Sequence, residues 1–285
     1  SDLVLVDFVW RRRHTLSTLP EPQPTSDEND RFATRAVAGA MILTVILLFV
    51  MLISSFITSR HLGKMNEQQA LTIDVYGHQW WWEVQYPNEA EPYRMVKTAN
   101  EIHVPVGTPI RIHGTSRDVI HSFWVPNIQG KRDLMPGYNT DVLMQADKVG
   151  RWRGQCAEYC GLQHAHMSFY LIAESQKDFD NWMTAQTQSS VSPTNAQTIH
   201  GQQVFLTHGC VLCHTIRGTT AGSNVGPDLT HLASRSTIAA GMLPNTIGNL
   251  GGWILNAQSL KPGCRMPPHE ISGPDLQDLL AYLET

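Results

Sequence analysis

The chain has 285 residues, enough for two modest domains that each bury a core, and only 16% of its residues are charged. Its 21 basic and 25 acidic side chains give a formal net charge of -4, and "RRRH" at 11–14 is its one basic cluster. This balance argues against a nucleic-acid-binding protein, which needs an extended basic stripe. The low charged fraction predicts instead that part of the chain is strongly apolar.

Residues 36–59 form that apolar part, an uncharged run with the sequence "AVAGAMILTVILLFVMLISSFITS". Crossing a bilayer takes roughly 20 apolar residues, and a helix buried in a soluble core would show a polar face that this run lacks. We therefore expect a transmembrane helix at 31–62. The basic cluster at 11–14 favours a cytoplasmic side for residues 1–30, which form either a cytoplasmic segment or the end of an earlier transmembrane helix.

Between residues 63 and 186 the hydrophobic pattern changes from continuous to alternating. The stretches "LTIDVYGHQWWWEVQY" and "EIHVPVGTPIRIHG" alternate as β-strands do, and Pro and Gly mark turns between them. Further short strands continue to about residue 173, which predicts a compact Greek-key barrel or sandwich. A helix is expected at 175–186, in "SQKDFDNWMTAQ".

A polar segment without apolar periodicity, 187–197, then separates this β-rich block from a smaller one at 198–285. Its composition is typical of a linker. The last block has helical spacing, for example in "PDLQDLLAYLET", where four leucines share one face behind a Pro and an Asp. We expect a small helical domain.

The helical block contains "CVLCH", from Cys210 to His214. In this pattern two thiols bind haem covalently and the histidine is an axial iron ligand, so Cys210, Cys213 and His214 are candidate haem-binding residues. A redox pair or half of a zinc site would need a βαβ context or a second ligand pair. The sixth iron ligand is expected to be Met266, with Met242 and His269 as alternatives.

The stretch "GQCAEYCGLQHAHM" at 154–167 gathers two cysteines, two histidines, a glutamate and a methionine. A disulfide would leave His164 and Met167 unexplained, a thioether is a poor zinc ligand, and a catalytic thiol needs one cysteine only. Soft donors of this kind favour copper, and a second cysteine indicates a second copper. One more histidine is needed: His121, at the end of a predicted strand, is the first choice, and the alternatives His113 and His103 fit strand alternation as solvent-facing residues.

The sequence resembles a known family at three places: "GHQWWWEVQYP", "VIHSFWVP" and "GQCAEYCGLQHAHM" are similar to the copper domain of subunit II of haem-copper cytochrome c oxidases. The block at 198–285 resembles class I cytochrome c in "GQQVF", "GPDLTHL", "KPGCRMPP" and "LLAYL". The fusion of the two is similar to the caa-type arrangement. It implies a multi-domain membrane protein with a transmembrane helix, a cupredoxin-like Greek-key barrel and an all-α cytochrome c domain.

The resemblance also implies a set of ligands for a binuclear mixed-valence copper centre (CuA). Cys156 and Cys160 would bridge the two coppers. His121 and Met167 would complete one copper, and His164 with the backbone carbonyl of Glu158 would complete the other. In the same family the Glu158 carboxylate points toward a magnesium ion shared with the catalytic subunit, and Met266 is the iron ligand.

The implied function is that of the electron-input subunit of a terminal oxidase in a bacterial inner membrane, with its copper and haem domains on the periplasmic side. Electrons from cytochrome c or a quinol-oxidising complex would pass from the haem to the copper centre. The haem-copper catalytic subunit, with other oxidase subunits, would then couple oxygen reduction to proton pumping.

Trp80 corresponds to the electron-entry tryptophan of the family, whereas the sequence around Glu28 matches the family's proton-channel carboxylate too weakly to assign that role. Oxygen chemistry is not expected in this chain. The alternatives are the equivalent subunit of a CuA-type nitric oxide reductase and a membrane-anchored electron carrier or copper-delivery protein without a catalytic partner.

Overall fold

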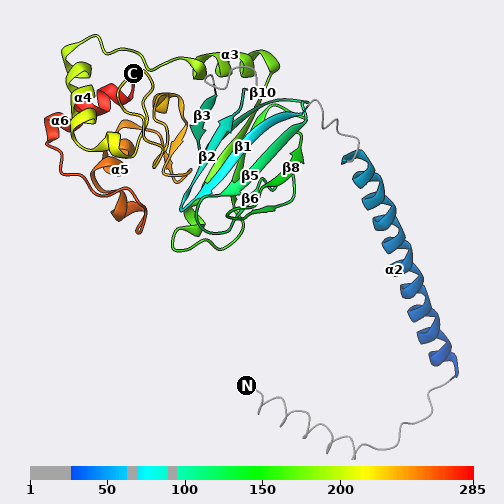
Figure 1. The fold of residues 1–285 in the computed structure, drawn as a ribbon. Coiled ribbons are helices and arrows are strands. Elements are labelled where there is room, and N and C mark those ends of the chain that lie inside the picture. The colour runs from blue at the N-terminus through cyan, green and yellow to red at the C-terminus, as the bar shows by residue number, and fades with distance from the viewer. Residues whose placement is uncertain (1–26, 63–69, 89–94) are drawn as a thin grey trace, which may run out of the picture. The chain divides into compact units, whose positions relative to one another are not determined.

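The computed structural model describes residues 27–62, 70–88 and 95–285 of the chain (Figure 1). Two compact units are distinguished, Ser1–Lys64 and Met65–Thr285, and each is described by itself. The N-terminal stretch "SDLVLVDFVWRRRH" lies outside the described residues.

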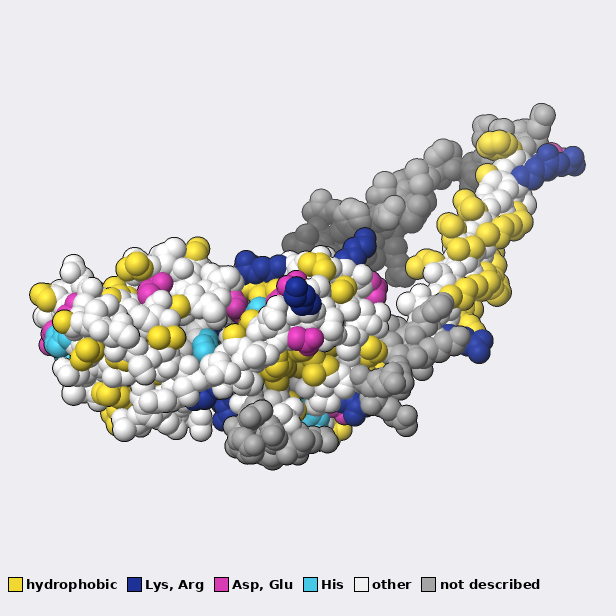
Figure 2. Space-filling view, turned by 90° about the horizontal axis from the view of Figure 1, so that it is seen from above, with side chains coloured by type: hydrophobic (Ala, Val, Ile, Leu, Met, Phe, Trp, Pro, Cys, Tyr) yellow, Lys and Arg dark blue, Asp and Glu magenta, His cyan; other side chains and the backbone are white. Residues whose placement is uncertain are grey.

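The first unit contains one long helix, α2 (Asp27–Leu62). Within the described residues it is the one helix long and apolar enough to cross a membrane, over Asp30–Arg60. Figure 2 shows apolar side chains along the helix and basic ones toward its two ends. The hydroxyls of Thr44 and Thr58 donate to the helix's own carbonyls at Ala40 and Ser54, which leaves them satisfied in an apolar environment.

The helix agrees with the predicted span at 31–62 and begins four residues earlier. Glu28 falls in its first turn.

Two five-stranded sheets pack face to face in the second unit and form a β-sandwich (Figure 1). All neighbouring strands are antiparallel except β1 with β5 and β4 with β10. The first sheet has the order β3 (Val96–Ala99), β2 (Trp81–Tyr86), β1 (Leu71–His78), β5 (Ile110–Ser116), β8 (Thr140–Met144). The second has the order β4 (Glu101–Pro105), β10 (Ser168–Glu174), β9 (Gly150–Cys156), β6 (His121–Trp124), β7 (Arg132–Leu134).

The core between the sheets follows from the alternation of the strands. Every second residue of β1 and β5 is buried, and these side chains meet a cluster of aromatic rings from both sheets. Trp82 lies edge-on to Phe123 and Phe169, which stack on each other at 4.8 Å. The core thus confirms the predicted all-β domain, in the form of a sandwich.

The aromatic run "QWWW" spans a turn as well as a strand. A turn at Gln79 and Trp80 separates β1 from β2, so Trp80 lies in the turn whereas Trp81 and Trp82 lie on β2. Trp82 faces the core, and Trp81 on the opposite face stacks on His78 at 4.4 Å. The three tryptophans therefore have three different environments.

Helix α3 (Gln176–Thr187) closes the sandwich, with the Ser175 side chain as its N-cap. The C-terminal region contains α4 (Ala196–Thr207), α5 (Ile247–Leu260) and α6 (Gly273–Leu283) around a second apolar core. Helices α4 and α6 cross where Gly201 meets the Asp278 carbonyl, at a point where a Cβ would come within 1.9 Å of that oxygen. Short elements complete the region: η4 (Cys210–Leu212), η5 (Leu232–Ser234), β11 (Thr237–Ile238) and β12 (Leu243–Pro244).

Candidate metal centres

One end of the sandwich brings together side chains from two strands and the loop between β9 and β10. His121 is the first residue of β6 and Cys156 the last of β9. Cys160 lies in the loop after β9, and the short helix η3 (His164–His166) ends beside Met167. The ligand atoms of His121, Cys156 and Cys160 all lie within 4.8 Å of one another.

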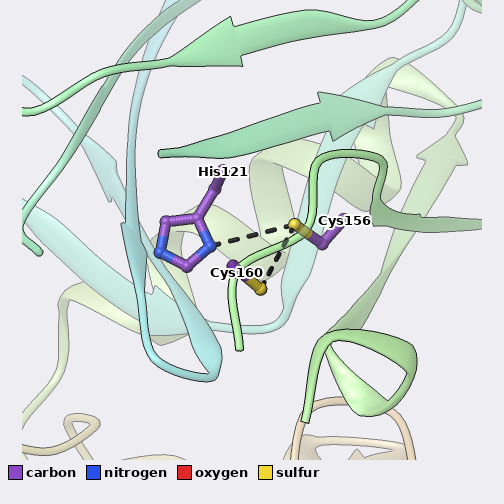
Figure 3. Close-up of side chains that lie close together, drawn as sticks. All are labelled: His121, Cys156 and Cys160. Atoms are coloured by element: carbon purple, nitrogen blue, oxygen red, sulfur yellow. Dashed lines mark hydrogen bonds between the residues drawn. The ribbon is translucent and has the colours of Figure 1, made fainter. Parts of the chain in front are cut away.

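The two cysteine sulfurs form the middle of this cluster, 3.7 Å apart and without a disulfide bond. Figure 3 shows them facing each other, with the His121 ring pointing a nitrogen at Cys156. Four further donors surround them: His121 Nδ1 at 3.8 Å and Glu158 O at 3.2 Å from Cys156, and His164 Nδ1 at 3.7 Å and Met167 Sδ at 3.9 Å from Cys160. The structure therefore gathers all six expected donors.

Asp118 orients the His121 ring. Its carboxylate pairs with Nε2 of His121 at 2.8 Å, which leaves Nδ1 facing Cys156. Burial lowers the pKa of His121, but the hydrogen bonds to Asp118 and Cys156 outweigh it and raise the pKa overall. Behind the ring lies Gly77, where a Cβ would come within 2.6 Å of His121 Cδ2. The imidazole is thus held from both sides.

The two thiols differ in acidity because they share a hydrogen bond. That bond, with a smaller effect of His121, lowers the pKa of Cys156, whereas the same bond and burial raise the pKa of Cys160. Two sulfur atoms, two imidazoles, a thioether and one carbonyl oxygen form a soft donor set that suits copper better than zinc or a hard cation. The residues present fit a copper centre.

The two alternative histidines lie elsewhere. His113 pairs with Asp141 at 2.8 Å on the exposed side of β5, as expected of a solvent-facing residue. His103 was also expected to face solvent, but this was wrong: only 12% of its side chain is exposed, because it stacks on Trp182 at 4.1 Å and hydrogen-bonds to Glu174.

A second site lies in the C-terminal region, where a cavity of about 350 Å³ is lined mostly by apolar side chains. Cys210, Cys213 and His214 line it together with Met266. The His214 Nδ1–H donates to the Pro227 carbonyl at 2.7 Å, so the acceptor nitrogen of the ring is Nε2. Burial lowers the pKa of His214, which keeps the imidazole neutral and able to bind a metal.

Among the alternatives for the sixth iron ligand, His269 also lines the cavity, whereas Met242 does not. The apolar lining, the cysteine pair and the neutral imidazole fit a covalently held haem. The cavity also reaches the sandwich, where Gln79, Trp80 and Trp81 form part of its wall.

Trp80 connects the two sites. Its ring lines the cavity, and its Nε1–H donates to the Cys160 carbonyl at 2.9 Å. Sequence reasoning missed Asp118 and Lys261, which lie at the same junction. Asp118 precedes His121 by three residues, a local signal that could have suggested a contact, but nothing in the sequence near Lys261 indicates that it is buried.

Comparison with known proteins supports both sites. The family described as "Cytochrome C oxidase subunit II, periplasmic domain" matches residues 88–174, and the family "Cytochrome c" matches residues 199–285. "Cytochrome c oxidase subunit 2" of Arabidopsis thaliana is 31% identical over 64% of this chain and 76% of that protein. The chain belongs to the cytochrome c oxidase subunit II family. It carries a fused cytochrome c domain at its C-terminal end.

One further relative and one solved structure also match parts of this chain. "Cytochrome c oxidase subunit 2" of Alkalihalophilus pseudofirmus is 38% identical over 75% of this chain, which spans 60% of that relative's length. A crystal structure of the periplasmic domain of subunit II of cytochrome oxidase of Bradyrhizobium japonicum is 32% identical, with a TM-score of 0.38. That match covers 41% of this chain and 92% of the other.

Proposed function

We propose that this chain is the electron-input subunit of a haem-copper terminal oxidase in a bacterial inner membrane. The observation that carries the proposal is the junction of the two sites: Trp80 and Met266 line the same cavity, and Trp80 hydrogen-bonds to the Cys160 carbonyl. When bound, a haem in the cavity and a copper pair at the cysteines would each take up and release one electron.

The chain's own residues would hold these groups as follows. Cys210 and Cys213 bind the haem covalently, and His214 and Met266 are its iron ligands. Cys156 and Cys160 would be ligands of both coppers, His121 and Met167 would be further ligands of one, and His164 and the Glu158 carbonyl would be further ligands of the other. The Glu158 carboxylate takes part in a magnesium site shared with the catalytic subunit.

The surroundings of these residues support transfer of electrons rather than bond-making. His121 is fully buried and fixed by Asp118, and Met167 is fully buried as well, so the donor set is rigid. Tyr159 and Leu162, on the same loop as Cys160, are large apolar side chains that stay exposed. They provide a surface for the catalytic subunit.

Helix α2 anchors the chain in the membrane, and the copper and haem sites lie on the periplasmic side. The electron donor is cytochrome c or a quinol-oxidising complex.

Electron paramagnetic resonance on the purified full-length complex tests the proposal. An unpaired electron shared by two equivalent coppers is expected, with two coppers and one covalent haem per chain. Cys156→Ser should abolish this signal and leave the haem spectrum intact. A single-copper signal, bound zinc, or loss of both cofactors together would overturn it.

Two further measurements address the whole complex. Co-purification with a large polytopic haem-bearing subunit is expected, and a chain isolated without one would be an electron carrier or a copper-delivery protein instead. Consumption of oxygen rather than nitric oxide by the complex distinguishes an oxidase from a nitric oxide reductase.

A further inference from the structure

Lys261 is a lysine with only 2% of its surface exposed, directly after the end of α5. Its Nζ donates to three backbone carbonyls: Trp80 at 2.7 Å, His166 at 2.8 Å and Ala239 at 3.2 Å. An ammonium group has three protons, so these three acceptors satisfy it completely below the lowered pKa of this lysine. Burying a cation is costly, and it is tolerated where each of its donors finds a partner.

Two of the three carbonyls belong to the β-sandwich and one to the cytochrome c domain itself. Trp80 lies in the turn between β1 and β2, and His166 directly precedes the proposed copper ligand Met167. Lys261 thus ties the cytochrome c domain both to the tryptophan between the two sites and to the loop that carries two copper ligands. This contact also gives a role to the backbone of His166.

Further hydrogen bonds around Lys261 join the cytochrome c domain to the β-sandwich. Ser168 donates to the Ala240 carbonyl from both its N–H, at 3.1 Å, and its hydroxyl, at 2.8 Å. The Gln163 side-chain amide donates to Pro262 O at 2.9 Å. At Gly241 the approach is so close that a Cβ would lie 2.4 Å from the Ser168 hydroxyl. This geometry permits one arrangement of the two backbones.

Hydrogen bonds to charged side chains lie at the edge of the contact between the two domains. The Ser236 N–H donates to a Glu101 carboxylate oxygen at 2.9 Å, and Arg151 donates to the Ser236 hydroxyl at 2.7 Å. Because Glu101 and Arg151 lie on β4 and β9, the cytochrome c domain contacts the sheet as well as the copper loop. A fully hydrogen-bonded buried lysine and charge-assisted hydrogen bonds at a polar edge are features of a specific interface rather than a passing contact.

We propose that Lys261 is a positioning residue that fixes the cytochrome c domain in a single position over Trp80 and the His164–Met167 loop. The electron that leaves the haem then always enters the copper centre from the same distance and direction. Its role in electron transfer rests on the proposed function, whereas the fixed position itself depends on contacts between residues of this chain alone.

Hydrogen–deuterium exchange on the full-length complex tests the fixed position without reference to activity. In Lys261→Met, the amides of Ser168 and Ser236 should exchange at least about tenfold faster, because three carbonyls lose their donor and the interface opens. Lys148→Met makes the same chemical change at an exposed lysine of the sandwich and should leave both amides unchanged. Equal protection of Ser168 and Ser236 in the wild type and Lys261→Met would overturn the proposal.

Electron transfer gives the second readout. With haem and copper bound, one electron would pass after photoreduction from the site held by Cys210 and Cys213 to the site held by Cys156 and Cys160. Lys261→Met should slow this transfer about tenfold or more and make it dependent on viscosity, since only the docked fraction reacts. Copper and haem content, measured beforehand, separate failure of this proposal from failure of the proposed function.

If Lys261→Met does not fold, Gly241→Ala replaces it as a wedge in the same interface. It should increase exchange at Ser168 and slow the transfer in the same way. Fast, viscosity-independent transfer in a fully loaded variant would contradict a positioning role.

Discussion

The Nε1–H of Trp80 donates a hydrogen bond of 2.9 Å to the backbone carbonyl of Cys160, one of the two central cysteines of the copper site. The same indole forms part of the wall of the haem cavity. A single buried side chain therefore contacts both sites, and it keeps its orientation because the ring is 8% exposed and hydrogen-bonded at its polar end.

Trp80→Phe should slow electron transfer from haem to copper about tenfold or more, since a bridging ring and its hydrogen bond to Cys160 are both lost. Flash photolysis of the full complex measures this rate. Trp81→Phe is the matched control, because Trp81 also lines the cavity but stacks on His78 instead. Equal rates in the two variants would show that Trp80 has no special part in the transfer.

Gly77→Ala should lose copper while keeping haem. The new methyl group would lie 2.6 Å from Cδ2 of His121, which has no room to move, so the imidazole is pushed out of its position next to Cys156. Overpacking of this kind costs about 1–3 kcal/mol. Metal analysis of the purified complex measures the loss. Gly130→Ala adds a methyl group into open space and should retain copper; retention in both variants would contradict the prediction.

How far the sequence predicts the copper site depends on how local its residues are. Cys156, Cys160, His164 and Met167 lie close together in the sequence, at the end of β9 and in the loop after it, so their spacing alone indicated a shared metal. His121 comes from β6, 35 positions before Cys156, and its choice over two other histidines rested on its position at the end of a predicted strand. Asp118, three residues before His121, left a local signal in the sequence, whereas Gly77 acts through packing between strands, which no spacing in the sequence encodes.

The contact between the two domains was even less predictable. The polar composition of residues 187–197 indicates a linker, yet this segment hydrogen-bonds to the cytochrome c domain: Ser190 N–H donates to Arg217 O at 3.0 Å, and His231 donates to Gln188 O at 3.0 Å.

Lys261 is a charged residue after a helix, where exposure is the usual expectation. Its burial depends on three carbonyls from distant parts of the chain, and only the tertiary structure brings them together.

Met266→Ala should leave the haem attached, because Cys210 and Cys213 bind it covalently, but should change the iron ligation and lower the reduction potential. Absorption spectra and a potentiometric titration measure both effects. Met242→Ala is the control: Met242 does not line the cavity, so neither property should change. An altered spectrum in Met242→Ala or His269→Ala, with Met266→Ala unaffected, would assign the ligand to that other residue.

The stability of the chain should depend on pH through Lys261. Burial lowers the pKa of its ammonium group to about 7, from an ordinary value of 10.5. Between these two pH values the unfolded chain binds a proton that the folded chain has released, so the free energy of unfolding increases as the pH rises. Below about pH 7 the Lys261 side chain is protonated in both the folded and the unfolded chain, so the increase in the free energy of unfolding is absent there.

Urea unfolding in detergent, from pH 6 to pH 9, measures this effect as the difference between the wild type and Lys261→Met. The difference in the free energy of unfolding should be constant below about pH 7 and then grow by up to about 1.4 kcal/mol per pH unit. Lys148→Met should give no such trend, since an exposed lysine has nearly the same pKa in both states. A difference for Lys261→Met that stays constant up to pH 9 would mean that its ammonium group remains protonated within the interface.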